Sequence, residues 1–451
     1  MTTPVETRTE RPRTDTRRTF LKRTSAVAAG LAAAPYISVA PRAFAANSDT
    51  LKVGLVGCGG RGTGAASQTL EADKNVVLHA MGDIFEDRLK GSLAQIKKQH
   101  GERTMVTPDT SFLGFDAIEK VIASGVDVVI LATPPGFRPY HIKRCVEAGK
   151  HVFTEKPMAT DGPGVRMVLE AAAKAKEKRL ALTSGFCWRY NPAERQMMQR
   201  IHDGQIGTPL ALQNTYNTGS LWVHPRKPDW NDMTYQLRNW YYFTWLSGDH
   251  IAEQAVHSLD KMQWAMKDEP PVKCIAHGGR QVRTGADFGH IYDHFSVVYE
   301  YANGARGYHS CRQQPNTASD NSDYFLGSKG VATIKAFGTL FITGENPWRL
   351  RSREGIPNMY QVEHDEMYAS IRRGTPINDG VWMAQSTLVA IMGRMAAYTG
   401  QEISWEQALN SRENLAKWVT NQEDAAGDPA FDWNMPLRTP EVAMPGQTKF
   451  V

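Results

Sequence analysis

Cysteine is scarce in this sequence, and its spacing is irregular. The five cysteines among 451 residues are an odd number and include no Cys-x-x-Cys pair. A disulfide framework needs paired cysteines and a structural zinc site needs closely spaced ligands, so the sequence predicts neither a disulfide framework nor a metal site. An oxidising compartment would permit a disulfide without requiring one.

Long apolar runs and a surplus of one charge are also missing. Residues 26–40 are mildly apolar, but the stretch is too short and too rich in Ala and Gly to span a bilayer. The chain has 52 Lys and Arg against 47 Asp and Glu. Residues 1–45 contain eight of the basic and three of the acidic residues, so residues 46–451 contain 44 basic and 44 acidic residues. This neutral main part favours neither nucleic acid nor a membrane anchor as a partner.

The first 45 residues are predicted to be a targeting segment that precedes two domains. Residues 16–22 read Thr-Arg-Arg-Thr-Phe-Leu-Lys, a twin-arginine motif, and residues 43–45 read Ala-Phe-Ala, a cleavage site. We expect cleavage after Ala45 and a periplasmic or secreted protein. Twin-arginine export resembles a route for proteins that fold, and often bind a cofactor, before they cross the membrane. The alternative is a disordered basic tail.

Residues 50–170 are predicted to form a dinucleotide-binding Rossmann domain. Helical stretches separate short apolar runs, which are predicted to be strands at 51–56, 76–83, 126–132 and 151–154, with helices over 63–70, 86–99 and 139–148. Strands that alternate with helices in this way predict a parallel, doubly wound sheet, and therefore the α/β class.

Residues 171–425 are predicted to form a substrate-binding α+β domain with a large, mostly antiparallel open sheet. Alternating patterns indicate strands at 294–301 and 304–310, joined by a turn at Asn303 and Gly304. A further strand pair is expected within 331–343, and helices over 363–373 and 380–398. Residues 426–451 are predicted to be an irregular C-terminal tail.

A glycine motif stands between the first strand and the first helix of the Rossmann domain. In Gly57-x-Gly59-x-x-Gly62 the first glycine permits a tight turn, the second lets the backbone approach a pyrophosphate, and the third lets helix and strand pack closely. The helix N-terminus then offers free N–H groups to the phosphates. Gly60 and Arg61 lie inside this turn and belong to the same predicted cofactor site.

Asp83 predicts a preference for NAD over NADP. It ends the second strand, 26 residues after Gly57, where a carboxylate accepts hydrogen bonds from ribose hydroxyls and repels a 2′-phosphate. Arg61 and Arg88 could instead neutralise a 2′-phosphate, so NADP stays open. Thr133 and Pro134 end a later strand at the edge of the sheet where ligands bind. Nearby His141 is expected to pack locally.

The order of the motifs resembles the Gfo/Idh/MocA family of oxidoreductases. The glycine turn, the acid-ended strand and Thr133-Pro134-Pro135 are followed by Glu155-Lys156-Pro157. The resemblance continues through residues 185–192, 256–260 and 393–395, and therefore covers about residues 50–420. It implies that Lys156 is an active-site lysine and that Glu155 and Lys156 lie beside the cofactor. It also implies a homo-oligomer that forms through the open face of the second-domain sheet. The alternative for Lys156 is a surface lysine before a turn proline.

Residues 248–268 are predicted to form one helix. Glu253, His257 and Asp260 would then share a face, so that Asp260 could fix the tautomer of His257. In the resembled family the position of Glu253 is usually Asp. The longer side chain could bind a substrate hydroxyl instead of steering His257. The alternative is a solvated helix face with a structural histidine.

Tryptophan placement indicates a carbohydrate ligand. Five of the 11 Trp fall between residues 222 and 264, and aromatic faces among polar groups suit the apolar faces and hydroxyls of a sugar. An aromatic core or a subunit interface is the alternative. The predicted substrate-binding residues are Arg189, Tyr190, Asn231, Trp245, Glu253 and Asp260, with His309 as a further candidate.

Together these features predict an exported NAD-dependent oxidoreductase that acts on CH–OH groups of a sugar, glycoside or polyol. Hydride would pass between a substrate carbon and the nicotinamide, with Lys156 and His257 transferring the hydroxyl proton and Glu253 beside them. Because the periplasm is not expected to contain a free NAD pool, a tightly bound cofactor is expected. The alternatives are an NAD-dependent glycosidase that oxidises the sugar transiently, and a non-catalytic sugar-binding protein.

Overall fold

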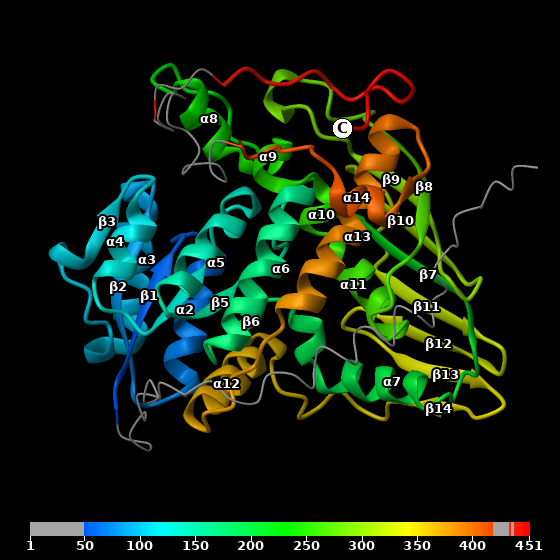
Figure 1. Ribbon diagram of the computed structural model, residues 1–451, viewed down its shortest axis with the longest axis horizontal. Coiled ribbons are helices and arrows are strands. Elements are labelled where there is room, and N and C mark those ends of the chain that lie inside the picture. Colours follow the sequence, from blue (N-terminus) through cyan, green and yellow to red (C-terminus); the bar gives the residue numbers. More distant parts are fainter. Residues whose placement is uncertain (1–48, 418–432, 434–436) are drawn as a thin grey trace, which may run out of the picture. The chain divides into compact units, whose positions relative to one another are not determined.

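The first domain is built on a six-stranded parallel sheet with the order β3-β2-β1-β4-β5-β6 (Figure 1). The computed structural model describes residues 49–417, 433 and 437–451, so the predicted leader lies outside the described residues. The strands are β1 Leu51–Val56, β2 Val76–Asp83, β3 Ser111–Leu113, β4 Val128–Leu131, β5 His151–Thr154 and β6 Leu182–Ser184. β1, β4 and β5 are mostly apolar and buried because helices cover both faces of this sheet. The predicted parallel sheet is confirmed.

Helices cover each face of this sheet with a separate apolar cluster. On one face the cluster contains α2 Gly60–Ala72 and α3 Glu86–His100, together with α12 Met359–Arg372 from much later in the chain. The opposite cluster contains α4 Ala117–Ala123, α5 Arg138–Glu147 and α6 Gly162–Glu177. The predicted domain boundary after residue 170 falls within α6, and β6 beyond it completes the sheet.

The second domain is built on a nine-stranded sheet with the order β14-β13-β12-β11-β7-β10-β9-β8-β15. All neighbouring strands are antiparallel except β7 and β10, which confirms the predicted mostly antiparallel sheet. The predicted hairpin is present as β9 and β10, and the pair within 331–343 as β12 and β13. The strands are β7 Pro209–Thr218, β8 Lys273–Gly279, β9 His294–Glu300, β10 Arg306–Gln313, β11 Ser322–Gly327, β12 Gly330–Lys335, β13 Leu340–Gly344, β14 Trp348–Arg349 and β15 Ile403–Ser404.

Three helices pack on one face of the second sheet: α7 Pro192–His202, α11 Val256–Ala265 and α13 Gly380–Thr399 (Figure 1). Helix α13 is buried along nearly its whole length because it also packs against α6 and thereby joins the two sheets. Apolar side chains of the other sheet face remain exposed at Leu210, Ile275, Tyr308 and Leu326. This face is therefore open, as predicted.

The single helix predicted over 248–268 is wrong, because the chain breaks between α10 His250–Glu253 and α11. At the break the Ala255 N–H donates to the carbonyl of His250, five residues earlier, and Gln254 donates to the same carbonyl. Such a π-type widening inserts an extra residue and rotates the next helical turn about the axis. Glu253 and Asp260 therefore do not share one face.

The remaining short elements connect these layers. They include the helices α8 Asp232–Arg238, α9 Thr244–Ser247 and α14 Trp405–Asn410, and the 3₁₀ turns η1 Gly101–Arg103, η2 Pro108–Thr110, η3 Pro135–Phe137, η4 Cys187–Tyr190, η5 Trp240–Tyr242 and η6 Ala286–Phe288. Residues 437–451 are irregular, as predicted, while 426–432 and 434–436 lie outside the described residues.

No helix in the described ranges has both the length and the apolarity to cross a membrane. All five cysteines are described, and each is a buried free thiol.

A buried carboxyl in the second domain predicts pH-dependent stability. Glu194 in α7 is fully buried, and its two oxygens have no hydrogen-bond partner in the described part of the chain. Burial raises its pKa from 4.5 to about 7, although the positive charge of Lys261 opposes this shift. The folded protein thus binds the Glu194 proton more tightly than the unfolded chain does. The stability that this difference provides is fully present below about pH 4.5 and is lost as the pH rises through about 7.

We expect Glu194→Gln to raise the free energy of unfolding by roughly 1–3 kcal/mol at pH 8 and to change it little at pH 4. Urea unfolding at the two pH values measures this difference. Glu170→Gln, at an exposed site on α6, is the matched control and should have a small effect at both. Equal effects of Glu194→Gln at both pH values would contradict the expectation.

Candidate active site

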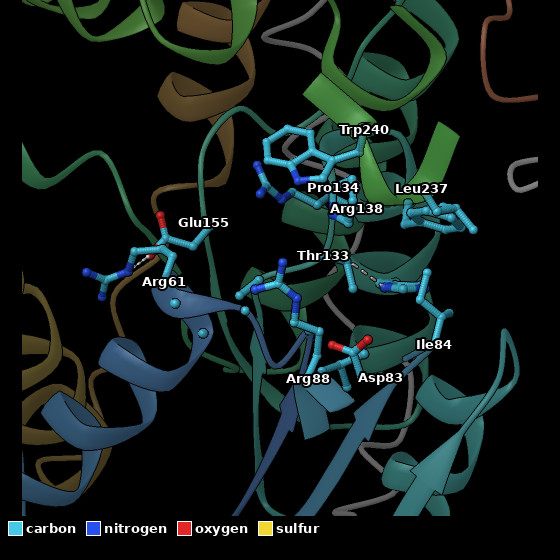
Figure 2. A pocket seen from close by; sticks show the side chains of 18 of the residues that line it. Arg61, Asp83, Ile84, Arg88, Thr133, Pro134, Arg138, Glu155, Leu237 and Trp240 are labelled. Carbon is cyan, nitrogen blue, oxygen red and sulfur yellow. Dashed lines mark hydrogen bonds and ion pairs between the residues drawn. The ribbon is translucent and has the colours of Figure 1, made fainter. Parts of the chain in front are cut away.

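One cavity of about 690 Å³ contains most of the residues that the sequence singles out. It lies at the carboxyl edge of the parallel sheet, where β1, β2, β4 and β5 end, and residues of the second domain close its other side (Figure 2). All of the predicted cofactor-binding residues line it: Gly57, Gly59, Gly60, Arg61, Gly62, Asp83, Thr133, Pro134, Glu155 and Lys156. The predicted proton-transfer group lines it too: Lys156, Glu253 and His257.

The glycine turn has the shape that a pyrophosphate requires. Gly57 has a φ of +95°, and an added Cβ would lie 2.6 Å from the backbone of Ala132. At Gly62 a Cβ would overlap the carbonyl oxygen of Gly57. At Gly59 and Gly60, by contrast, a Cβ would meet nothing within 4 Å, so open space lies where the phosphates of a dinucleotide would approach. Helix α2 starts there without a side-chain cap, which leaves its first N–H groups available to an anion.

Asp83 is fixed at the end of β2 by backbone donors. Its carboxylate accepts hydrogen bonds from the N–H of Cys58 at 2.6 Å and of Phe85 at 2.8 Å. Burial raises the pKa of Asp83, while these donors and the charge of Arg88 oppose the shift. Figure 2 shows Asp83 and Arg88 side by side. The position suits a ribose hydroxyl, and the neighbouring guanidinium leaves the choice between NAD and NADP open.

Arg61 is paired away from that end of the cavity. Its Nε lies 2.7 Å from a carboxylate oxygen of Glu155, and its guanidinium lies 4.9 Å above the ring of Tyr360 (Figure 2). A mostly buried pair of this kind holds both side chains in place. Of the two arginines that could neutralise a 2′-phosphate, Arg88 is therefore the one beside Asp83.

Lys156 and Glu253 form an ion pair at the junction of the two domains. The Lys156 ammonium donates to Glu253 Oε1 at 3.1 Å and also to the backbone carbonyl of Glu253. The two side chains are only 13% and 12% exposed. The sheet of the first domain presents Lys156 just after β5, while α10 presents Glu253, so tertiary packing creates the pair.

His257 lies at the start of α11 and faces the same cavity. Burial, with the positive charges of Lys156 and Lys261, holds its pKa well below its usual range, so the imidazole is neutral near pH 7. Its Nδ1 is buried and has no hydrogen-bond partner in the part of the chain that the structure describes. A neutral imidazole can accept a hydrogen bond from a hydroxyl, whereas an ammonium can only donate one.

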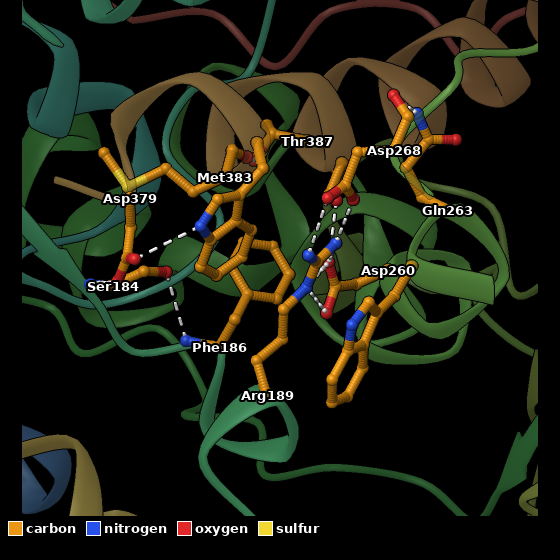
Figure 3. Close-up of polar contacts among 12 residues, drawn as sticks. Ser184, Phe186, Arg189, Asp260, Gln263, Asp268, Asp379, Met383 and Thr387 are labelled. Carbon is orange, nitrogen blue, oxygen red and sulfur yellow. Dashed lines mark hydrogen bonds and ion pairs between the residues drawn. The ribbon is translucent and has the colours of Figure 1, made fainter. Parts of the chain in front are cut away.

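Asp260 does not orient His257, which corrects the sequence-based prediction. Its carboxylate accepts hydrogen bonds from Arg189 at 2.8–3.2 Å and from the Ser386 hydroxyl at 2.7 Å (Figure 3). Arg189 also binds Asp268, and its guanidinium lies 4.1 Å from the ring centroid of Trp382. The break before α11 turns Asp260 into this buried network and away from the cavity.

Other predicted ligand contacts also lie elsewhere. Among the described residues, the cavity lining does not include Arg189, Tyr190, Asn231, Trp245, Asp260 or His309. The Tyr190 hydroxyl donates to Asp379, Asn231 caps α8, and the Trp245 indole N–H donates to Gln236 at 2.7 Å. His309 is buried against Asn214. Each of these side chains already has a protein partner.

Several further residues line the cavity, none of which had been assigned individually to a ligand from the sequence. The second domain contributes Tyr216, Trp222, His224, Leu237, Arg238, Trp240 and Gln254, and the first domain contributes Ile84, Phe85, Phe115 and Arg138. The cluster of tryptophans was a usable signal, but it could not show that Trp222 and Trp240 face the cavity while Trp245 is buried. His141 lines the cavity and hydrogen-bonds Thr133 at 3.3 Å, which agrees with the expected local contact. No group of metal-ligating side chains is found among the described residues.

The fold and the cavity define a two-domain, dinucleotide-binding protein with a lysine and a histidine at the domain junction. Residues 51–186 match the family described as "Oxidoreductase family, NAD-binding Rossmann fold", and residues 195–333 match the "GFO/IDH/MocA C-terminal domain". These two matches together cover more than half of the chain. The chain belongs to the Gfo/Idh/MocA family of oxidoreductases.

Curated relatives are distant. "Inositol 2-dehydrogenase 3" of Saccharopolyspora erythraea is 28% identical over 257 residues, which are 57% of this chain and 65% of that protein. "Trans-1,2-dihydrobenzene-1,2-diol dehydrogenase" of Mus musculus is 26% identical over 59% of this chain and 74% of that protein. The chain thus spans just under two thirds of the length of the first of these relatives.

Solved structures share the fold. The aldose-aldose oxidoreductase from Caulobacter crescentus, complexed with glycerol, superposes with a TM-score of 0.62 at 19% identity, over 79% of this chain and 99% of that chain. Levoglucosan dehydrogenase in complex with NADH and levoglucosan gives 0.62 at 18% identity, over 78% of this chain and 99% of that chain. At these identities the likeness concerns the architecture.

Proposed function

We propose that the protein is an exported oxidoreductase that uses tightly bound NAD to oxidise or reduce a CH–OH group of a sugar, glycoside or polyol. One observation carries the proposal: a single cavity joins the glycine turn to Lys156, Glu253 and His257. The same space can therefore receive a dinucleotide and a hydroxyl-bearing substrate. A bound nicotinamide would supply the hydride acceptor or donor.

The residues of the chain divide the proton chemistry between them. The Lys156 ammonium, oriented by its pair with Glu253, can donate a hydrogen bond to the substrate oxygen as negative charge develops there. His257, which is neutral near pH 7, can take the hydroxyl proton during oxidation and return it during reduction. Glu253 also lines the cavity, so it can accept a hydrogen bond from a second substrate hydroxyl.

The lining supports a sugar or polyol as substrate. Together with Lys156, Glu253 and His257, the lining includes Tyr216, which offers an aromatic surface, and Gln254, which offers a hydrogen-bonding amide. The names of relatives that act on inositol, and of structural neighbours that act on aldoses, agree with this substrate class.

NAD is proposed over NADP because Asp83 would lie against the 2′-position of the adenosine ribose. The carboxylate accepts hydrogen bonds from hydroxyls and repels a phosphate. NADH and NAD complexes among the structural neighbours support the same choice.

Export and a captive cofactor are proposed together. The twin-arginine motif and the cleavage site after Ala45 support delivery to the periplasm. A cofactor that is not recycled there must return to its starting redox state in each cycle. Two reactions satisfy this condition. One is oxidation of one sugar with reduction of another. The other is oxidation of a glycoside carbon, elimination of the aglycone, addition of water, and reduction of the same carbon by the NADH that formed.

We also propose self-association through the open face of the second sheet. Exposed Leu210, Ile275, Tyr308 and Leu326 lie on strands of this face and provide an apolar surface for a second copy. Sedimentation of the purified protein measures this association, and a monomer at high concentration would contradict it.

The decisive test uses protein cleaved after Ala45 and purified without added cofactor. Denaturation should release one NAD or NADH per chain, and mixed aldoses or an aryl glycoside should then react without net NADH. Free aglycone would identify glycoside cleavage. Released NADP would contradict the role of Asp83, and failure to bind either dinucleotide on titration would overturn the oxidoreductase assignment.

A further inference from the structure

We propose that residues 221–243 form a strap that closes the adenosine end of the cavity and retains the dinucleotide through successive turnovers. This inference rests on the proposed function, since it presumes a bound dinucleotide. The strap connects the end of β7 to α9 and contains α8 and the 3₁₀ turn Trp240–Tyr242. It belongs in sequence to the second domain, yet it contacts the first.

The strap faces the residues that surround the adenosine position. Five of its side chains line the cavity: Trp222, His224, Leu237, Arg238 and Trp240. Opposite them the first domain contributes Ile84, Phe85 and Arg88, which come shortly after Asp83, and Phe115 from the neighbouring loop. In Figure 2, Leu237 and Trp240 lie across the cavity from Asp83 and Arg88. The glycine turn alone would leave this end uncovered.

Arg238 anchors the strap to the first domain. Its guanidinium donates to both carboxylate oxygens of Asp87, at 2.9 and 2.7 Å, and lies 3.6 Å from the ring centroid of Phe85. The hydrogen bond from Arg238 lowers the pKa of Asp87, which therefore stays ionised at neutral pH. Bidentate pairing and stacking on an aromatic ring both require the planar guanidinium.

The Arg238 side chain also lines the cavity. Its contacts with Asp87 and Phe85 thus hold this part of the strap against the first domain, at the edge of the space that a dinucleotide would occupy.

An apolar cluster fixes the rest of the strap. Tyr241, Tyr242 and Phe243 are buried in one cluster with Phe137 of the first domain, and Ile84, Phe85 and Phe115 pack at its edge. Within the strap, Asn239 exchanges two hydrogen bonds of 2.9 Å with the backbone of His224, and the Tyr242 hydroxyl donates to the Trp222 carbonyl at 2.9 Å. Release of the adenosine half therefore requires the Arg238 contacts to break and part of this cluster to open.

The test is the rate at which bound NADH leaves the protein when excess NAD is added, followed by NADH fluorescence. We expect Arg238→Ala to accelerate dissociation at least about tenfold, since interface changes act mainly on dissociation. Arg226→Ala is the matched control. Arg226 pairs with Asp232 inside the strap at 2.5 Å and should leave the rate unchanged.

A second variant removes the first-domain partner of Arg238, which is Asp87. Asp87→Asn should accelerate dissociation in the same direction, and Arg238→Ala combined with Asp87→Asn should be no faster than Arg238→Ala alone. Asp87 is 62% exposed, so its substitution keeps the protein testable if Arg238→Ala fails to fold. Rates within twofold of wild type for both variants would overturn the strap while the proposed function stands. A wild-type protein that binds neither NADH nor NADPH would instead overturn the proposed function itself.

Discussion

Replacing Lys156 by methionine is expected to lower turnover by about 10²–10⁴-fold, the range that a positioned proton-transfer or charge-stabilising group contributes. Methionine preserves length and apolar packing but removes the ammonium that donates to Glu253. Oxidation would then lose its nearest positive charge for the developing alkoxide. The measurement is the rate at which the bound nicotinamide is reduced in a single turnover by a reactive sugar or polyol.

Two observations separate a chemical role for Lys156 from a structural one. Lys174→Met, at an exposed position on α6, should retain full turnover. Dinucleotide stoichiometry in Lys156→Met should stay near one per chain, so that the loss appears in the chemical step. Wild-type turnover in Lys156→Met would exclude the role proposed for Lys156 in the chemical step.

Gly59→Ala is expected to weaken dinucleotide affinity by roughly tenfold to 100-fold without loss of the fold. Gly59 has φ of −72° and ψ of −178°, a conformation that alanine adopts freely, and the new Cβ would meet no protein atom within 4 Å. The methyl group would instead enter the space that a pyrophosphate needs. Calorimetric titration with NAD after removal of bound cofactor measures the change, and each tenfold is about 1.4 kcal/mol.

The matched control for this substitution is Gly91→Ala on α3, where a Cβ also meets nothing within 4 Å. It should leave affinity unchanged and stabilise the helix by roughly 0.5–1 kcal/mol. Equal NAD affinity in Gly59→Ala and wild type would contradict the assignment of the turn to a phosphate. Gly62→Ala, by contrast, should impair folding because its Cβ would overlap the Gly57 carbonyl.

Local sequence was sufficient to predict most of the fold. The apolar runs that became β1, β2, β4 and β5 are largely buried on both faces, so their composition alone distinguishes them from amphipathic strands. The alternating pattern that became β9 and β10 has one buried face and indicated the second sheet equally well. The glycine motif and Asp83 depend on backbone geometry within the consecutive elements β1, α2 and β2, which short-range sequence determines.

The parts of the site that sequence alone did not predict depend on contacts between distant segments. The break before α11 comes soon after Asp249, whose buried carboxylate accepts from the Tyr292 N–H at 2.9 Å and from the Tyr398 hydroxyl. Those donors lie 43 and 149 residues away, so a helical pattern over 248–268 could not reveal them. Arg189 was assigned to the substrate for a related reason, since its carboxylate partners on α11 and beyond are set by packing.

Periodicity and local backbone conformation were enough to predict the class of the two sheets, the dinucleotide turn and the residue types that can transfer a proton. Three pairings instead depend on tertiary packing: Lys156 meets Glu253, Asp260 faces Arg189, and Arg238 crosses to Asp87. In the first two pairs burial separates the charged groups from water, and the nearest opposite charge in space, rather than in sequence, becomes the partner. Arg238 and Asp87 meet at a more exposed site, where the packing of α8 on the first domain brings them together.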